Sequence, residues 1–496
     1  MDQERPVYYA NELKPVDITE PSLRQIVQEL EGDIQKGIEA IKREDGASHI
    51  ENFGSIFSGY LGEAYAFLWL DYQSRDSHKT GDATGATAPN LLQDARLRID
   101  MSIGLSTRDV NPGRPSPITS STIGALVLRV LSGQWQEQDP KNLLAVLEIA
   151  VAQGPTFRFL DRPMGVDELV YGRAGLLWAI LEIWKRCPDQ ETQSAFAPVF
   201  QSVHRLVRAI VDAGHAGAKA YRDRAAKESS VDMPLMWPWF DDFYALGTMH
   251  GISGVLGTLL DPALPRHAMF VVDAYEKMAQ TISALCKLCI QDDGHLAMTV
   301  PPRPTSRPMP LVQICHGAPG VLTLLAAARR NARFAAQYWT AEWDEAIARA
   351  SDVIWKQGLL SKGCSLCHGL AGNALSLLLV VDPLGDTSTD GYLAAALAML
   401  LEAKSTPPFC SGETRYRMPD RPWSLFEGLA GVLCAWSEAS LLIKLKLKVM
   451  DRTKQGMVDP TLLAKDEEIK ELQRRLLGFP CLVGGVSGDA QSSFLT

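Results

Sequence analysis

The sequence lacks several features that would place the protein in a particular class. Its first residues contain no basic stretch followed by an apolar core, so we expect no secretory signal there. No uninterrupted apolar run reaches the roughly 18 residues that a membrane-spanning helix needs. Its nine cysteines form no dense, regular framework, which favours reduced thiols or metal ligands over disulfides. We therefore expect a cytoplasmic protein without a transmembrane segment, and we leave peripheral contact with a membrane open.

An excess of basic residues is missing as well. The formal net charge of -9 argues against a nucleic-acid partner. Hydrophobic residues make up 46% of the 496 residues and charged residues only 22%, which is typical of a folded protein with a large core rather than a disordered one. Length alone would suggest about two to four domains, but a repeat architecture can build one large domain from such a chain.

A repeat is visible in the glycines. Two glycines three residues apart precede an apolar stretch in SGYLGEAYAFL, YGRAGLLWAI, HGISGVLGTLL, HGAPGVLTLLA, HGLAGNALSLLL and EGLAGVLCAW, and SSTIGALVLRVL is a degenerate seventh copy around Gly124. Each copy is typical of a turn that runs into a buried helix, because the stretch is apolar nearly all round. Amphipathic segments such as KNLLAVLEIAVAQG lie between the copies and predict half-buried helices.

Seven alternations of buried and half-buried helices predict an all-α protein with a closed double α-toroid, or α/α barrel, of seven inner and seven outer helices. A linear solenoid of helix pairs is the alternative. In a toroid, glycines allow the inner-helix N-termini to crowd together around one cavity, into which backbone N–H groups point.

We expect residues 1–496 to form a single domain of this kind. Residues 73–118 include the polar stretch HKTGDATGATAPN, and we predict that they form a loop-rich insertion. Residues 451–478 contain DPTLLAKDEEIKELQRRLLG, which predicts an amphipathic C-terminal outer helix with Pro460 near its start.

The tripeptide Cys-His-Gly occurs twice, each time at the entrance to a predicted inner helix. Cys315, Cys367 and His368 should therefore converge, and three such ligands with one open position are typical of catalytic zinc. His316 is an alternative or additional ligand, and spacing alone does not decide between the two histidines. His250 occupies the same position in its own repeat, so it should face the same cavity as a general acid or base, or else cap a turn in the core.

The motifs YGRAGLL, HGISG, ICHGAPGV, LCHGLAGN and SLFEGLAG resemble the lanthionine synthetase C-like family, and most closely its eukaryotic branch, over nearly the whole chain. The resemblance implies the double α-toroid, zinc ligands at Cys315, Cys367 and His368, and a catalytic acid or base at His250. Bacterial members add a cysteine thiolate of a peptide to dehydroalanine or dehydrobutyrine. Eukaryotic members resemble glutathione-binding proteins that add glutathione to such electrophiles.

Two further stretches, LLSKGCSLCHG and RYRMPDRPW, resemble the segments with which the eukaryotic branch contacts glutathione. Glutathione carries two carboxylates and one ammonium group, so basic side chains can pair with the former and an aspartate with the latter. Near the N-terminus, another arginine resembles a family arginine close to the active site. The resemblance thus implies glutathione contacts at Arg5, Lys362, Arg417, Met418, Pro419 and Asp420.

These residues together predict a zinc-dependent enzyme that adds glutathione, as co-substrate, to dehydroamino acids in peptides or proteins. Arg173, at an inner-helix entrance, is predicted to line the cavity, and Asp167 to orient His250. A non-catalytic adaptor that binds glutathione or peptide through the same pocket is the alternative. A glycosidase would need two carboxylates about 5 to 10 Å apart, and no matched pair is evident among Glu63, Asp167, Asp241, Asp242 and Glu427.

Overall fold

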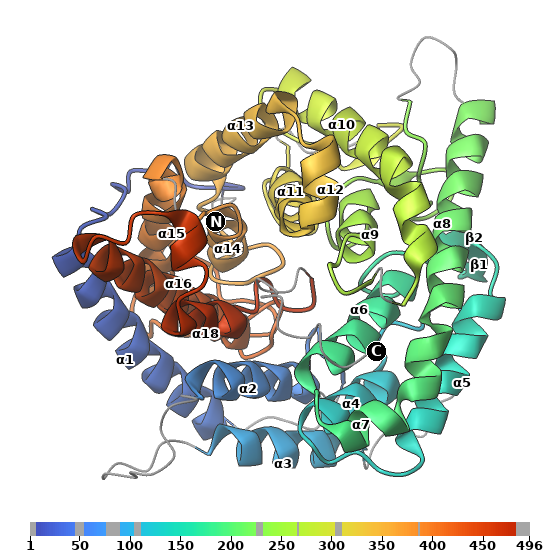
Figure 1. Ribbon diagram of the computed structural model, residues 1–496, viewed down its shortest axis with the longest axis horizontal. Helices are drawn as coiled ribbons and strands as arrows, with labels where there is room; N and C mark the ends of the chain where they lie inside the picture. Colours follow the sequence, from blue (N-terminus) through green and yellow to red (C-terminus); the bar gives the residue numbers. More distant parts are fainter. Residues whose placement is uncertain are drawn as a thin grey trace, which may run out of the picture.

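The computed structural model describes residues 6–44, 54–75, 90–103, 111–224, 232–264, 267–302, 310–384 and 387–482. These residues form helices arranged in two concentric rings, as Figure 1 shows. The all-α double toroid predicted from the repeat is therefore confirmed, and the linear solenoid is excluded. Within the same ranges, no helix is both long enough and apolar enough to span a membrane.

Of the helices in the described ranges, seven form the inner ring. Neighbouring members pack against each other all the way round, and the last packs on the first, so the ring is closed. In chain order they are α2 (Tyr60–Ser74), α4 (Ser121–Leu131), α6 (Arg173–Arg186), α9 (Ile252–Leu259), α11 (Pro319–Arg330), α14 (Leu370–Leu378) and α16 (Leu429–Lys454).

Seven helices among the described residues form the outer ring, and each packs on at least one inner helix. They are α1 (Glu20–Glu44), α3 (Leu91–Ile103), α5 (Asp139–Ala152), α8 (Ala197–Arg224), α10 (Tyr275–Gln291), α13 (Ala341–Gln357) and α15 (Asp390–Glu402). Shorter elements complete the fold: α7 (Gln190–Ala195), α12 (Ala332–Tyr338), α17 (Pro460–Leu463), α18 (Glu467–Arg475), η3 (Met269–Ala274), η4 (Thr387–Thr389), η5 (Ala403–Ser405), β1 (Thr156–Phe159), β2 (Arg162–Gly165), β3 (Tyr244–Ala245) and β4 (Thr299–Val300).

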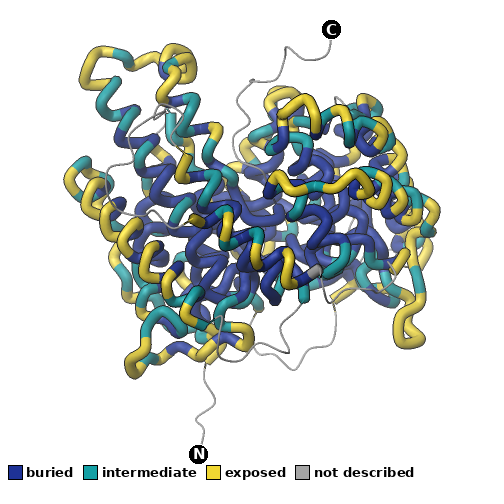
Figure 2. Tube along the Cα trace, turned by 90° about the horizontal axis from the view of Figure 1, so that it is seen from below, coloured by how far each residue is buried: buried dark blue, intermediate teal, exposed yellow. Residues whose placement is uncertain are grey.

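The two rings differ in how their side chains are buried. In α6 every residue from Arg173 to Ile183 is buried, which matches a sequence that is apolar all round apart from Arg173 and Glu182. In α8 the buried residues recur every three or four positions, as in Val199, Val203 and Leu206, while the opposite face is exposed. Figure 2 shows the result: buried chain fills the interior and exposed chain lies around it.

The second glycine of the repeat lies where a loop carbonyl crosses the first turn of an inner helix. A Cβ atom on Gly372 would lie 1.8 Å from the backbone oxygen of Leu366, and one on Gly254 would lie 1.9 Å from that of Thr248. No side chain fits at such distances, so glycine is required. The same six-residue spacing between glycine and carbonyl recurs at Gly62, Gly175 and Gly431.

Backbone hydrogen bonds join the seven entrance loops into a closed circle. Each loop donates an N–H group to a carbonyl of the next loop round the ring, which places all seven inner-helix N-termini at one end of the toroid. The donor and acceptor residues are Phe57 and Ile118, Ser116 and Tyr171, Val170 and Met249, Thr248 and Ile314, Cys315 and Cys367, Cys367 and Phe426, and Phe426 and Phe57.

The prediction of a loop-rich insertion at residues 73–118 is wrong for its central part, which forms the outer helix α3. Leu91, Ala95, Arg98, Ile99 and Ser102 are buried at helical spacing. The neighbouring Gly- and Thr-rich composition is typical of a loop, and the amphipathic pattern beside it is short. The stretch HKTGDATGATAPN lies outside the described residues, apart from its last one.

The prediction of one C-terminal outer helix over residues 451–478 is also wrong. The inner helix α16 extends to Lys454, and two short helices, α17 and α18, follow it. Gly456 has a φ of +93° and ends α16, and Asp466 caps α18 by accepting hydrogen bonds from two backbone N–H groups. Because seven outer helices already complete the outer ring, α18 packs on α16 at one face of the toroid.

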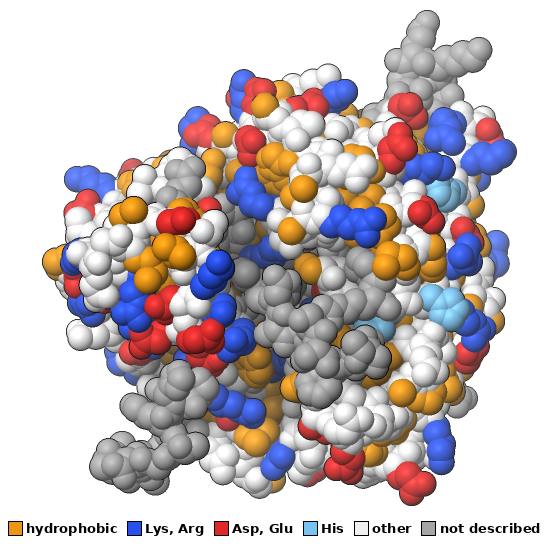
Figure 3. Space-filling view, in the orientation of Figure 1, with side chains coloured by type: hydrophobic (Ala, Val, Ile, Leu, Met, Phe, Trp, Pro, Cys, Tyr) orange, Lys and Arg blue, Asp and Glu red, His pale blue; other side chains and the backbone are white. Residues whose placement is uncertain are grey.

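The residues after α18 enter the middle of the inner ring. Phe479, Cys481 and Leu482 are buried, and Leu482 lies beside α9 and α11. The opening of the toroid is therefore filled by the chain itself at this end. Among the described residues on the face shown in Figure 3, basic and acidic side chains are interspersed.

Candidate functional site

The Cys-His cluster lies where the entrances of α11 and α14 meet. Cys315 comes shortly before α11, and Cys367 and His368 come directly before α14. The Cys315 N–H group donates to the Cys367 carbonyl over 3.2 Å. One ligand atom from each of the three residues lies within 4.8 Å of the other two, and both cysteines are buried. Residues 52 positions apart are thus brought together, as the repeat predicted.

The two thiols of the cluster have opposite pKa shifts. The pKa of Cys315 lies well below its usual value because Cys367 and His368 hydrogen-bond to its sulfur and His316 adds positive charge. The Gln313 amide also donates to this sulfur over 2.9 Å. The pKa of Cys367 lies well above its usual value because of its hydrogen bond with Cys315 and because of burial. The pair therefore loses its first proton readily, and a bound cation would favour loss of the second.

The donor set fits zinc. Two thiolates and one imidazole suit a borderline-soft cation, and three protein ligands leave a fourth position open for a substrate. The second histidine, His316, does not belong to this cluster among the described residues. Its ring lies instead 5.4 Å from that of Trp239 and 5.6 Å from that of His250. The geometry therefore favours His368 over His316 as the third ligand.

His250 lies beside this cluster, at the entrance to α9. Its Nδ1 atom is 3.2 Å from the Glu168 carboxylate, which itself accepts N–H groups from Val170 and Tyr171 over 3.0 and 2.7 Å. The His250 ring stacks with the rings of Tyr171 and Trp239, whose centroids are 6.1 and 5.3 Å away. Burial lowers the pKa of His250, but the bond to Glu168 and the nearby Cys315 outweigh burial, so that the pKa is raised. This arrangement gives an oriented imidazole that can donate a proton.

Two predictions about the neighbouring loop are corrected. Asp167 does not contact His250; its carboxylate pairs with Arg173 at 2.6 and 3.0 Å, and both side chains are at most 2% exposed. Arg173 also donates to the Gln153 carbonyl over 3.2 Å, so it holds the loop together instead of lining the cavity. Adjacent side chains in this tight loop point in different directions, and the one that reaches His250 is Glu168.

Two of the segments predicted to contact glutathione, the Lys362 loop and the segment from Arg417 to Asp420, lie side by side near the cluster. Lys362 is exposed, and its charge lowers the pKa of Cys367. The Arg417 N–H group donates to the Ser361 carbonyl over 2.9 Å, which joins the two predicted segments side by side. The Arg417 side chain forms an ion pair with Asp420, and that pair would have to open for each group to bind a ligand.

The other members of the predicted glutathione set differ in exposure. Met418 is 52% exposed, whereas Pro419 is buried. Arg5 lies outside the described residues. The carbonyl of Val7 accepts the Ser361 N–H group over 3.2 Å, so the first described residues run beside the Lys362 loop.

Several residues of the site were not predicted from sequence. Tyr171 is the first residue of the YGRAG entrance motif and Glu168 lies three residues before it, so the residues just upstream of the motif glycine were the signal in the sequence. Trp239 belongs to no repeat, and Gln313 precedes its motif without a distinguishing pattern. Glu427 is the first residue of the EGLAG motif, but nothing in that motif marks it as a site residue. Glu427 is half-buried, and its charge raises the pKa of Cys367.

The other acids considered for a glycosidase are committed to ion pairs. The pairs are Glu63 with Arg98, Asp167 with Arg173, Asp241 with Arg162, and Asp242 with Arg224. These four acids therefore do not provide the two free carboxylates that a glycosidase needs on either side of its sugar substrate.

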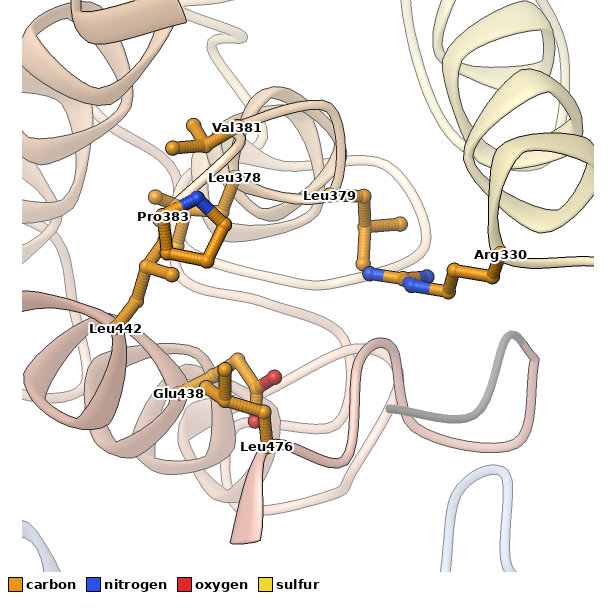
Figure 4. Close-up of a pocket in the computed structure, with 8 residues that line it drawn as sticks. All are labelled: Arg330, Leu378, Leu379, Val381, Pro383, Glu438, Leu442 and Leu476. Atoms are coloured by element: carbon orange, nitrogen blue, oxygen red, sulfur yellow. The ribbon is translucent and has the colours of Figure 1, made fainter. Parts of the chain in front are cut away.

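A small hollow lies at the other end of α11 (Figure 4). It is separate from the Cys-His cluster because Arg330 ends the helix that Cys315 precedes, and 12 residues of helix extend roughly 18 Å. Burial lowers the pKa of Arg330 to about 10 and raises that of Glu438 to about 7. The lining residues are Arg330, Leu378, Leu379, Val381, Pro383, Glu438, Leu442 and Leu476.

Glu438 should make the stability of the fold depend on pH. Its carboxylate accepts hydrogen bonds from Gln73 and from the backbone of Leu477 and Gly478, which anchors the C-terminal segment. The pKa of Glu438 is raised to about 7 in the folded protein. The protonated side chain therefore stabilises the fold fully at a pH below the pKa that Glu438 has in the unfolded chain. This stabilisation is lost as the pH rises through 7. We expect the free energy of unfolding to fall by on the order of 3 kcal/mol between pH 5 and 8, relative to Glu438→Gln.

Urea unfolding of both proteins across this pH range measures the difference. Glutamine cannot ionise, so the variant removes the carboxyl titration and keeps a side chain of similar size. Parallel pH curves for the wild type and Glu438→Gln would contradict the prediction.

Comparison with known proteins extends the sequence resemblance. Residues 125–441 match the family model described as lanthionine synthetase C-like protein. The protein named glutathione S-transferase LANCL1 from Danio rerio is 28% identical over 405 residues, which cover 77% of this chain and 88% of that protein. LanC-like protein GCL1 from Arabidopsis thaliana is 30% identical over 277 residues, 54% of each chain. The family match includes every candidate site residue except Arg5.

Proposed function

Since this chain belongs to the lanthionine synthetase C-like family, we propose that it is a zinc-dependent enzyme that adds glutathione to dehydroalanine or dehydrobutyrine residues of peptides or proteins. The observation that carries the proposal is the convergence of Cys315, Cys367 and His368 beside His250. That convergence combines a site for a thiol-activating metal with an oriented proton donor. The similarity to a protein named glutathione S-transferase supports glutathione as the thiol.

The Lys362 loop and the segment from Arg417 to Asp420 would hold glutathione. Lys362 and Arg417 supply positive charge for its two carboxylates, and Asp420 supplies negative charge for its ammonium group. Because Lys362 lies close enough to lower the pKa of Cys367, a ligand held there has its thiol within reach of the cluster. Zinc held by Cys315, Cys367 and His368 would lower the pKa of that thiol, so that the thiolate is present at neutral pH.

His250 would complete the addition. The sulfur of glutathione forms a bond to the β-carbon of the dehydroamino acid, and the electrons of the C=C bond move towards the carbonyl as an enolate. The His250 imidazolium then donates its proton to the α-carbon, which restores a saturated residue. Glu168 positions the ring through Nδ1 and stabilises the charged imidazolium before transfer.

The decisive experiment is to incubate the zinc-loaded protein with glutathione and a peptide that contains one dehydroalanine. The proposal expects the peptide to gain the mass of one glutathione, with turnover beyond one equivalent of protein. Glutathione binding by calorimetry without any conversion would support the adaptor alternative and overturn the enzymatic one.

Lys362 and Arg417 are expected to act in glutathione binding and not in metal binding. Lys362→Ala and Arg417→Ala should each weaken glutathione binding by roughly 5- to 100-fold, the effect of one lost charge-assisted hydrogen bond, while zinc content is retained. Titration calorimetry measures the affinity. The control is Lys219→Ala, which removes an exposed lysine paired with Asp223 on the outer helix α8. Unchanged affinity in Lys362→Ala and Arg417→Ala would make these residues surface charges only.

A further inference from the structure

The β1–β2 hairpin places an apolar side chain in solvent at its tip. Its strands pair from Thr156 with Gly165 to Phe159 with Arg162, and the two-residue turn between them consists of Leu160 and Asp161. Both turn residues have positive φ, +48° and +61°, a conformation that favours asparagine and glycine. Leu160 is nevertheless 81% exposed. A bulky residue at positive φ is strained, and the burial that would offset the strain is missing here, so we ask whether Leu160 contacts a ligand.

The hairpin is fixed to the wall of the candidate site. The Gly165 N–H group donates to the Trp239 carbonyl over 2.9 Å, and Arg162 forms an ion pair with Asp241. Trp239 is also one of the rings stacked on His250. The exposed tip is therefore held at a fixed position relative to the proton donor.

A series of stacked groups leads from the hairpin to His250. The Arg114 guanidinium lies 3.9 Å from the centre of the Phe159 ring and 4.5 Å from that of Tyr171. The Tyr171 ring is in turn 6.1 Å from that of His250. These groups are half-buried or exposed, so they form a continuous wall of aromatic and cationic groups. At about 3.3 Å per residue, an extended peptide covers the distance from His250 to Arg114 in about three residues.

The charge of this wall is not neutralised within the described residues. Arg114 forms no ion pair there, and Arg158 donates only to the backbone carbonyl of Asp161. Of the carboxylates nearby, Asp241 pairs with Arg162 and Glu168 with His250. Asp161 in the turn and Glu427, whose charge raises the pKa of Tyr171, form no ion pair with Arg114 or Arg158 among the described residues. An acidic side chain of a bound partner would complement these arginines, although the chain as a whole carries a net charge of -9.

We infer that Arg114, Phe159, Leu160 and Tyr171 form a docking track for the peptide segment that carries the electrophile. The segment has an acidic residue about three positions from the dehydroamino acid and an apolar residue further out, against Leu160. This inference rests on the proposed function, because it assumes that the electrophile reacts beside His250. It adds the class of peptide that the site selects.

Binding of unreactive peptides tests the track separately from catalysis. Three labelled peptides carry alanine in place of dehydroalanine and differ only in a glutamate, glutamine or lysine three positions away. With the zinc-loaded protein, fluorescence anisotropy should show the glutamate peptide binding about tenfold more tightly than the lysine peptide. Arg114→Gln should abolish this preference. The matched control is Arg208→Gln, which removes an arginine stacked on Phe270 at 4.4 Å on the outer helix α8 and should keep the preference.

Leu160→Asn tests the tip of the hairpin. Asparagine adopts positive φ more readily than leucine, so the turn should be at least as stable, and the melting temperature should not fall. We compare two peptides that carry leucine or serine at the position that lies against Leu160. Loss of the apolar contact in Leu160→Asn should weaken binding of the leucine peptide several-fold and that of the serine peptide less. An Arg114→Gln protein that still prefers glutamate, or a Leu160→Asn protein with unchanged affinity, would overturn the inference.

The two proposals fail in different ways. If the glutamate preference depends on Arg114 but no dehydroalanine peptide is converted, the docking track stands and the enzymatic function is wrong. If all three dehydroalanine peptides are converted equally well and Arg114→Gln changes nothing, the function stands and the docking track is wrong.

Discussion

Replacing Cys367 by alanine is expected to remove zinc from the protein. The wild type should purify with about one equivalent of zinc, since the cluster supplies three protein ligands and a fourth, open position. Loss of one of two thiolates leaves a thiol and an imidazole, a donor set too weak to retain the metal through purification. Elemental analysis after dialysis measures the content, so the result does not depend on any assay of activity.

Cys364→Ala is the matched control, because Cys364 is also buried and lies only three residues earlier. Cys364 is not one of the three clustered ligands. Its thiol donates to the Pro407 carbonyl over 3.4 Å, and burial raises its pKa to about 12, so it is not easily ionised. This variant should retain zinc. A full equivalent of zinc in Cys367→Ala would refute the assignment.

The same measurement of zinc content should distinguish the two histidines that follow the cysteines. His368→Ala is expected to lose zinc and His316→Ala to keep it, because only His368 has a ring nitrogen within 4.8 Å of both sulfur atoms. The opposite result would transfer the ligand role to His316.

The fold could be predicted from the glycines because they mark positions where the backbone leaves no room for a side chain. A loop carbonyl crosses the first turn of several inner helices, as at Gly254 and Gly372, and only glycine fits there. These glycines therefore recur in the sequence at the start of the predicted inner helices. The alternation of apolar and amphipathic helices then gives the two rings. Neither signal identifies a helix that lies beside a low-complexity stretch, which is why α3 was missed.

The site could be predicted only as far as positions in the repeat determine it. Residues at equivalent positions, such as Cys315 and Cys367, meet because hydrogen bonds join their loops into one circle. Which neighbour points inward depends on side-chain direction within a tight loop. Repeat position therefore points to the loop that contacts His250 but to the wrong acid in it, Asp167 in place of Glu168. It also leaves His316 and His368 as alternatives, between which the family resemblance chose His368.

Trp239 illustrates a further limit. It lies in an irregular segment between α8 and β3 and reaches His250 only through the folding of that segment. A residue outside the repeat carries no positional signal, and a single aromatic ring is more often part of the core than of a site.

Replacing His250 by asparagine should reduce the rate of glutathione addition by about 100- to 10,000-fold, the usual effect of losing a general acid or base. Asparagine keeps a polar group near Glu168 but cannot hold or donate the proton. The His250 ring is stacked with Tyr171 and Trp239 and is not part of the Cys-His cluster among the described residues, so zinc content and glutathione affinity should be retained. Single-turnover kinetics with a dehydroalanine peptide measures the chemical step.

Glu168→Gln separates the proton donor from the residue that positions it. Glutamine can still hydrogen-bond to Nδ1 of His250 but removes the charge that raises its pKa. Its rate should fall less than that of His250→Asn, and the alkaline limb of the pH–rate profile should move to lower pH, because the imidazolium then loses its proton sooner. Loss of zinc from His250→Asn would make His250 a ligand. An unaltered rate in a zinc-loaded His250→Asn protein would assign the protonation of the α-carbon to water or to another group.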